Sequence, residues 1–236
     1  GKDAQATLKF ADGSRLILNS GTTIVLGSQI YYPTTGASAN TINLERGSVN
    51  GNIERPPLMK NRYEVKTKTA ITAVRGTELD VGVDDVDDTR ASVFSGHVDV
   101  IAGDKEIKNK QGFGSRVGKE SKHQTEPLLP PSVFEKGAQV FSDSLPVVSW
   151  KAQPEAKKYR VELYPEAERS NLLWVRETTT SNMLIPAPRN GKYAVRVYAV
   201  PESGLLGLPA RTTFEYKAHP LPPVVLAPAA VDVYLG

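Results

Sequence analysis

Hydrophobic and polar residues alternate with a period of two along much of the chain, in short runs separated by glycine-containing turns. Residues 7–10 alternate in this way, Asp12-Gly13 follows, and residues 15–19 alternate again. An Asp-Gly pair between two such runs predicts a hairpin, because the type I′ turn needs positive φ at both central positions. No long window has the spacing of an amphipathic helix, and the best helical candidate, residues 165–173, is short. The pattern predicts an all-β protein.

The same pattern continues on both sides of a proline-dense stretch at 126–131. Before it, glycine turns separate the predicted strands 42–44, 63–67, 79–83, 91–94 and 98–101. After it, strands are predicted at 147–150, 159–163, 172–176 and 191–199. Many short strands with regular turns are typical of a sandwich, a barrel or a solenoid. A proline-dense segment is extended and semi-rigid, so we interpret residues 121–145 as a linker that sets the spacing of two domains.

Four motifs in the first 110 residues resemble the FecR domain family. They are a "DGS" opening within Leu8–Leu16, a glycine-centred segment Glu45–Val49, a core signature spread over Tyr63–Thr67 and Val74–Val81, and a closing segment Ser95–Val100. The resemblance implies a coiled, β-solenoid-like domain over residues 1–120. It assigns structural roles to turn and core positions, namely Asp12, Gly13, Gly47, Gly76, Thr77 and Gly96.

Residues 146–220 resemble a fibronectin type III-like β-sandwich. Trp150 occupies the early core tryptophan position, Tyr159 lies on the next strand, and Tyr193 lies in the strand 191–199. A large ring can span the gap of about 10 Å between two packed sheets, and Tyr193 is expected to make a tyrosine-corner contact. The segment 221–226 resembles 129–134, so residues 221–236 are interpreted as the start of a further repeat or a C-terminal tail. We therefore expect this chain to be a piece of a longer protein.

Composition removes several function classes. The chain has no cysteine, which excludes disulfides, cysteine-ligated zinc and thiol nucleophiles. A formal charge of +3 is too small to indicate nucleic acid. No apolar run approaches the roughly 20 residues of a membrane span. No catalytic motif is found, the three histidines have no metal-ligand spacing, and we expect neither an enzyme nor a cofactor.

Two charged clusters and one aromatic pair are candidate binding residues. Four aspartates crowd one predicted turn and are a weak calcium candidate, because the spacing lacks the glycine and distal glutamate of an EF-hand loop: Asp84, Asp85, Asp87 and Asp88. A basic stretch could contact polyanions or simply guard an edge strand: Lys105, Lys108, Lys110, Arg116, Lys119 and Lys122. Adjacent strand residues point to opposite faces, so one ring of Tyr31-Tyr32 is expected to be exposed and the other in the core.

These observations favour a non-enzymatic binding or scaffold protein of the bacterial envelope, periplasmic or envelope-associated, whose partners are envelope proteins or peptidoglycan. The alternative is a FecR-type signalling regulator. The resemblance implies a domain that receives a signal from an outer-membrane receptor and controls a sigma factor. An open strand edge within residues 5–120 would favour receptor docking. For the scaffold protein, binding is expected at strand edges or on loops, by strand addition or by polar surface contacts. An elongated molecule without a deep pocket would favour the scaffold.

Overall fold

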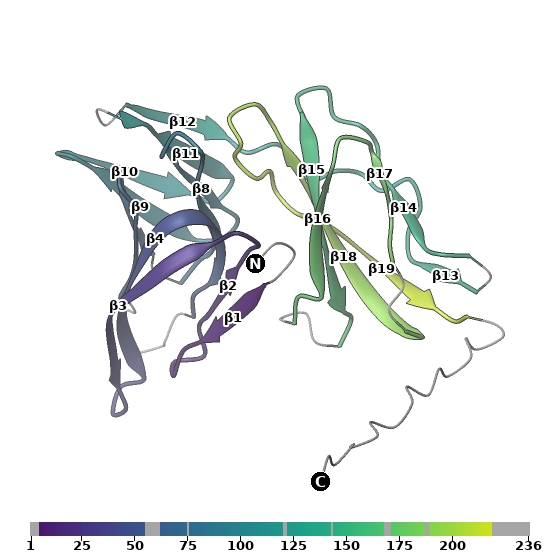
Figure 1. Ribbon diagram of the computed structural model, residues 1–236, viewed down its shortest axis with the longest axis horizontal. Helices are drawn as coiled ribbons and strands as arrows, with labels where there is room; N and C mark the ends of the chain where they lie inside the picture. The colour runs from purple at the N-terminus through teal and green to yellow at the C-terminus, as the bar shows by residue number, and fades with distance from the viewer. Residues whose placement is uncertain are drawn as a thin grey trace, which may run out of the picture.

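The structure is a computed structural model, and it describes residues 5–54, 62–74, 76–119, 122–142, 144–167, 171–186 and 189–218. Within these ranges the chain forms nineteen strands and no α-helix (Figure 1). No helix of the described residues is therefore long and apolar enough to cross a membrane. The all-β prediction is confirmed.

Twelve strands form the first unit. They are β1 (Ala6–Lys9), β2 (Arg15–Leu18), β3 (Thr23–Tyr32), β4 (Ala37–Asn52), β5 (Arg62–Lys66), β6 (Ile71–Val74), β7 (Glu78–Val83), β8 (Thr89–Val93), β9 (His97–Ala102), β10 (Lys105–Lys110), β11 (Phe113–Val117) and β12 (His123–Pro127). Their main order is β10-β9-β6-β5-β4-β7-β8-β11-β12, with β3 and the β1–β2 pair attached to β4. The sheet curls into a nearly closed, barrel-like shape (Figure 1).

The long strand β4 makes this curl possible. Its first half pairs with β3 on one side and β5 on the other, whereas its second half, from Gly47 onward, pairs with β2 and β7. Gly47 has φ +84°, and a Cβ there would lie 2.6 Å from Thr22 Oγ1. Only glycine allows this conformation and this close approach without strain. One strand therefore belongs to both halves of the curled sheet.

The core of the first unit consists of the inward-facing residues of both halves. Leu16, Ile42, Val81 and Val100 are among its fully buried members. Tyr63 packs its ring edge-on against Phe10, with 5.2 Å between the ring centroids, and its hydroxyl donates to the carboxylate of Asp12 at 2.9 Å.

Seven strands form the second unit. They are β13 (Gln139–Phe141), β14 (Val147–Ser149), β15 (Lys158–Pro165), β16 (Trp174–Thr178), β17 (Asn182–Leu184), β18 (Gly191–Val200) and β19 (Ala210–Tyr216). A five-stranded sheet has the order β13-β19-β18-β15-β16, and β14 pairs with β17 in a second, small sheet. The core between them contains Trp150, whose ring lies 5.3 Å from that of Tyr159. The Tyr193 hydroxyl donates to the Arg189 carbonyl at 2.8 Å.

The finer architectural predictions are not confirmed by this geometry. All strand pairs of the first unit are antiparallel except β4–β5, whereas the coils of a β-solenoid stack strands in parallel. The fibronectin type III assignment and the domain boundaries remain predictions. Within the predicted linker 121–145, β12 pairs with β11 and β13 pairs with β19. Residues 221–236 lie outside the described residues.

Candidate functional site: an open strand edge and a polar interface

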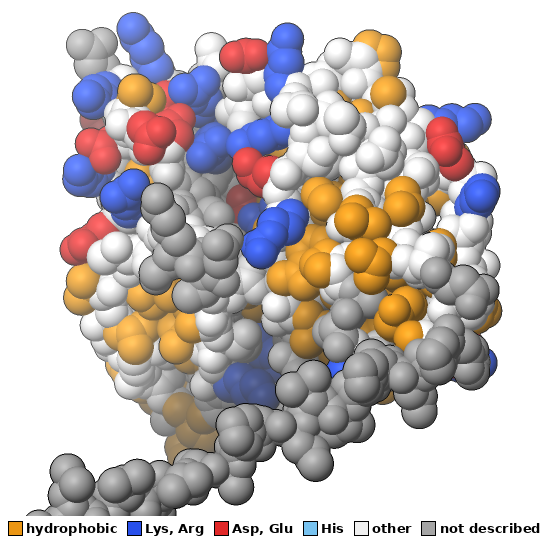
Figure 2. All heavy atoms as spheres, turned by 45° about the vertical axis from the view of Figure 1, so that its right-hand side comes forward, with side chains coloured by type: hydrophobic (Ala, Val, Ile, Leu, Met, Phe, Trp, Pro, Cys, Tyr) orange, Lys and Arg blue, Asp and Glu red, His pale blue; other side chains and the backbone are white. Residues whose placement is uncertain are grey.

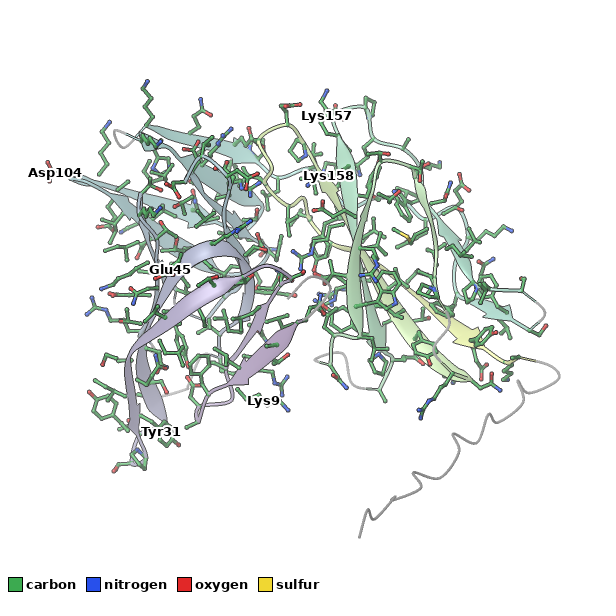
Figure 3. The ribbon with its side chains drawn as sticks, in the orientation of Figure 1. Lys9, Tyr31, Glu45, Asp104, Lys157 and Lys158 are labelled. Atoms are coloured by element: carbon green, nitrogen blue, oxygen red, sulfur yellow. The ribbon has the colours of Figure 1, made fainter. Side chains whose placement is uncertain are left out.

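The strand β3 forms an open edge of the first unit. Among the described residues it pairs only with β4, so the backbone groups of its other edge have no strand partner. Five of its apolar or aromatic side chains are exposed: Val25 at 49%, Leu26 at 50%, Ile30 at 42%, Tyr31 at 41% and Tyr32 at 51%. Figure 3 shows Tyr31 near the end of the β3–β4 hairpin, on the side away from the second unit. We call β3 with these five side chains the β3 edge.

The exposure of both tyrosines corrects one sequence prediction. Tyr31 and Tyr32 point to opposite faces, and we expected one of them in the core. Both rings are exposed at the end of the β3–β4 hairpin, although their cross-strand neighbours on β4, Ser38 and Ala37, are buried. Alternation tells which residues share a face, but it does not tell whether that face is covered.

The β3 edge lacks the charges and prolines that protect many edge strands. It is ten residues long and contains no charged residue and no proline. Natural proteins guard exposed edges with lysines, prolines or bulges, because an open edge pairs readily with another strand. The edge strand β10 follows this rule, with exposed Lys105, Lys108 and Lys110. The β3 edge carries only irregularities of register near Thr23 and between Leu26 and Gln29, so it is a candidate docking edge.

A second exposed apolar surface lies on the second unit. Figure 2 shows apolar side chains gathered on the side of β13, β14 and β17, where Val140, Val147 and Leu184 are exposed. Val147 and Leu184 are cross-strand neighbours. The strands here are only three residues long. This surface therefore offers much less backbone for strand addition than the β3 edge.

The two units meet face to face through the outer sides of their sheets. On the first unit these sides belong to β2, β4, β7 and β8, and on the second to β15 and β18. An apolar part contains Phe94, Tyr198 and Leu206, with 5.4 Å between the Phe94 and Tyr198 ring centroids. Backbone contacts add to it, since the Leu206 amide donates to Ser92 Oγ at 3.0 Å. We call this contact the inter-unit interface.

A buried ionic cluster lies at the centre of the inter-unit interface. Arg160 of β15 contacts Glu162 Oε1 through Nη2 at 2.9 Å and lies 3.8 Å from Asp80 Oδ1 of β7. Its Nη2 also donates to the side-chain oxygens of Asn19 and Asn50, at 2.6 and 2.7 Å. The guanidinium thus links the second unit to three side chains of the first. We call Arg160, Glu162, Asp80, Asn19 and Asn50 the Arg160 cluster.

Burial perturbs the protonation equilibria of this cluster. Loss of hydration raises the pKa of Asp80 to about 6, although Arg160 and Arg90 oppose the rise, and Glu162 adds to it. Burial alone would lower the pKa of Arg160, but the carboxylates of Glu162 and Asp80 raise it on balance. Asp80 Oδ1 accepts no hydrogen bond among the described residues. The cluster therefore contains one carboxylate, that of Asp80, whose loss of hydration is only partly offset by its neighbours.

The second carboxylate of the cluster is better satisfied. Glu162 Oε2 accepts hydrogen bonds from the hydroxyls of Tyr164 and Tyr198, at 2.6 and 3.1 Å. Burial and then the charge of Glu162 raise the pKa of both tyrosines, which keeps them protonated as donors. Two neighbouring strands of the second unit carry these side chains, with Arg160, Glu162 and Tyr164 on β15 and Tyr198 on β18. Strand pairing therefore holds them in fixed register.

The aspartate cluster predicted as a weak calcium candidate is engaged within the protein. Asp84 Oδ1 accepts the amides of Val86 and Asp88, and Arg116 forms ion pairs with Asp84 and Asp88 at 3.4 and 3.0 Å. Asp87 pairs with Lys68 at 3.0 Å, while Asp85 is exposed. Within the described residues no group of three potential ligands is arranged for a metal.

The residues of the predicted basic stretch lie on different elements of the structure. Arg116 pairs with aspartates, as described above, and the Lys110 ammonium lies 5.2 Å from the centre of the Phe113 ring. The lysines of β10 lie on one edge strand, whereas Lys119 and Lys122 flank the turn between β11 and β12. A polyanion contact at these positions remains a prediction.

The remaining predicted positions lie in turns and cores. Gly13, Gly47, Gly76 and Gly96 all have positive φ, and Thr77 Oγ1 donates to the His97 carbonyl at 2.9 Å. The sequence analysis missed the Arg160 cluster. The only signal was the alternation of Arg160 and Glu162 with apolar residues, which is equally typical of a strand face in contact with water.

Comparison with known proteins gives a family match for the first 99 residues. Residues 1–99 match the FecR protein family. No curated protein matches the chain.

Two crystal structures of a candidate anti-sigma factor from Parabacteroides distasonis are similar to part of the chain. One has a TM-score of 0.45 and 17% identity, over 54% of this chain and 57% of that one. The other has a TM-score of 0.45 and 14% identity, over 60% and 76%. Fibronectin(III)-like modules of Clostridium thermocellum CbhA match with a TM-score of 0.28 and 9% identity, over 83% and 95%. With TM-scores below 0.5, these structures carry no argument about this chain. The family match does: residues 1–99 form a FecR family domain.

Proposed function

We propose that this chain is the envelope-side part of a FecR-type signalling regulator. In this role it receives a signal through contact with an envelope protein and passes it towards the control of a sigma factor. The observation that carries the proposal is the FecR family domain at residues 1–99. The β3 edge supports it further, because an open strand edge in this domain is the feature that receptor docking needs. The location we propose is the periplasm or the cell envelope.

The docking step we propose is strand addition. A partner segment in extended conformation would pair with the free side of β3, so that its backbone satisfies the open N–H and C=O groups. The exposed side chains of Leu26, Ile30 and Tyr31 would then give affinity through burial of apolar area. Since β3 has no charge of its own, selectivity would depend on side-chain pockets and not on steering by charge.

The scaffold interpretation has no comparable support. It predicts binding at strand edges or on loops, by strand addition or by polar contacts, and its candidate polar residues include the lysines of β10. The open β3 edge suits both interpretations, and the FecR family match is what favours signalling. An enzymatic role finds no support in the FecR family match, and we propose none.

Site-specific photocrosslinking tests the proposal. A benzoyl-phenylalanine at position 31 should crosslink in intact cells to an envelope receptor or a sigma-regulatory protein, identified by mass spectrometry. The same group at Lys108, on the guarded edge β10, serves as the positional control. Cell-wall assembly proteins or peptidoglycan as the only products would refute the signalling function.

A matched pair of variants tests whether the crosslink depends on the β3 edge. Leu26→Lys adds a guarding charge to an exposed position and should abolish both the crosslink and the sigma-dependent transcriptional response. Val86→Lys makes the same change at a residue that is 56% exposed in the turn between β7 and β8, and it should change neither. Equal effects of the two variants would show that the β3 edge is not the docking site.

A further inference from the structure

A pocket opens in the inter-unit interface beside the Arg160 cluster, with a volume of about 250 Å³. Strand pairing places Arg15 of β2 opposite Asn52 of β4, and Asn52 opposite Glu78 of β7. These three side chains therefore form a row across the first unit. Arg196 of β18 and Arg211 of β19, also cross-strand neighbours, line the pocket from the second unit. Both units thus build one site.

The charges around this pocket are unbalanced. Arg196 and Arg211 share a single carboxylate, that of Glu78, at 3.0 and 3.5 Å. Glu162 also lines the pocket, but Arg160 and the two tyrosine hydroxyls already satisfy it. The guanidinium of Arg15, whose backbone belongs to the β1–β2–β4 ladder, has no hydrogen bond or ion pair with a side chain of the described residues. Three guanidinium groups against two carboxylates leave a positive excess in a site that is shielded on two sides.

Part of the pocket wall is apolar. Ile17 and Phe94 contribute aliphatic and aromatic surface from the first unit. Tyr164 contributes its ring from the second, and the Arg196 guanidinium lies 4.8 Å from the centre of that ring. A purely ionic ligand would leave this apolar surface unused, whereas a ligand with a compact apolar body would cover it.

We propose that the pocket binds a small organic anion. Arg15 and Arg211 hold its carboxylate or phosphate group, because the Arg15 guanidinium has no partner among the described residues and Arg211 is half-exposed with only a long contact to Glu78. The apolar body of the ligand lies against Ile17, because the Tyr164 and Phe94 rings line the pocket but are only 3% and 6% exposed. A volume of about 250 Å³ limits the body to the size of a single ring or a short branched chain. This proposal does not depend on the signalling function.

A ligand in this position touches both units at once. It would bind the assembled interface and not the separated units, so bound ligand should raise the unfolding temperature of the whole chain. It would also add a negative charge next to three arginines, which share too few carboxylates in its absence. Binding and the stability of the inter-unit interface are therefore linked.

Calorimetric titration of the chain with sodium benzoate, and separately with inorganic phosphate, tests the proposal at constant ionic strength. Benzoate should bind with a dissociation constant of about 1 mM or lower and should raise the unfolding temperature in a saturable way. Arg15→Gln and Arg211→Gln should each weaken binding about tenfold or more, because each removes a charge-assisted hydrogen bond. Arg46→Gln, at an exposed position of β4 outside the pocket, should leave the dissociation constant unchanged.

Two outcomes would overturn the proposal. One is the absence of saturable benzoate binding below about 10 mM, whether or not phosphate binds, since phosphate binding alone would mean an anion site without an organic specificity. The other is equal benzoate affinity of Arg15→Gln and the unsubstituted chain. Circular dichroism of the variants checks that they fold, which is expected because the Arg15 side chain has no partner to lose within the described part of the chain.

Discussion

Replacing Asp80 by asparagine should make the protein less sensitive to rising pH. Burial raises the pKa of Asp80 from 3.8 to about 6, so the folded protein favours the protonated side chain. Ionisation of this buried carboxyl therefore opposes folding: the stability it contributes is complete below about pH 4 and is lost as the pH rises through about 6. At 1.36 kcal/mol per pKa unit, the full loss is about 3 kcal/mol. Asparagine mimics the neutral form at every pH and avoids this loss.

The measurement compares how much the free energy of unfolding changes between two pH values in each of the two proteins. Urea unfolding, followed by tryptophan fluorescence, gives the free energy of unfolding of both proteins at pH 4 and pH 7.5. Relative to the unsubstituted chain, Asp80→Asn should gain about 2–3 kcal/mol between these two pH values. Titrations of groups distant from Asp80 occur in both proteins and cancel. Coincidence of fluorescence and circular dichroism transitions checks that unfolding is two-state.

An exposed aspartate provides the control. Asp104→Asn, in the turn between β9 and β10, should show a pH-dependent difference within about 0.5 kcal/mol. If Asp80→Asn gains less than about 1 kcal/mol between the two pH values, then burial in the inter-unit interface does not raise the pKa of Asp80 as far as about 6. A loss in place of a gain would mean that the ion pair with Arg160 outweighs the cost of burial.

Two further predictions concern stability. Arg160→Met should lower the free energy of unfolding by about 3–5 kcal/mol in urea denaturation, because it leaves the carboxylate of Glu162 buried without its cation; a loss below about 1 kcal/mol would contradict a buried ion pair. Gly47→Ala should cost at least about 1 kcal/mol more than Gly21→Ala in the same assay. Both glycines have positive φ, but a Cβ at Gly47 would lie 2.7 Å from Thr22 Cα, whereas at Gly21 it meets nothing within 4 Å. Equal losses for the two glycine variants would rule out this steric argument.

The strand content could be predicted because it depends on local patterns. The alternation of apolar residues and the Asp12-Gly13 turn are read directly from neighbouring residues, and β1 and β2 pair as that pattern requires. The FecR domain could be predicted from the order of its glycine motifs. The curl of the sheet around β4 could not, because it depends on which strands pair on each side of one long strand.

The candidate sites were harder to predict for a related reason. On β15 the residues Tyr159, Val161 and Leu163 face the core, while Arg160 and Glu162 face the first unit. A polar row that meets water and a polar row that meets another domain have the same pattern. The open edge of β3 could not be predicted either, because the sequence of a strand does not show which of its two edges is paired.

The continuity of β4 has a mechanical consequence. At about 3.3 Å per residue its 16 residues would span about 50 Å when extended, with no loop between its two halves. Tension applied through a strand on the free side of β3 would pull first on the β3–β4 hydrogen bonds and then along the β4 backbone. The other half of β4 carries Asn50, which holds Arg160. A pull that the β3–β4 hydrogen bonds withstand therefore travels along the covalent backbone of β4 to the contact between the two units.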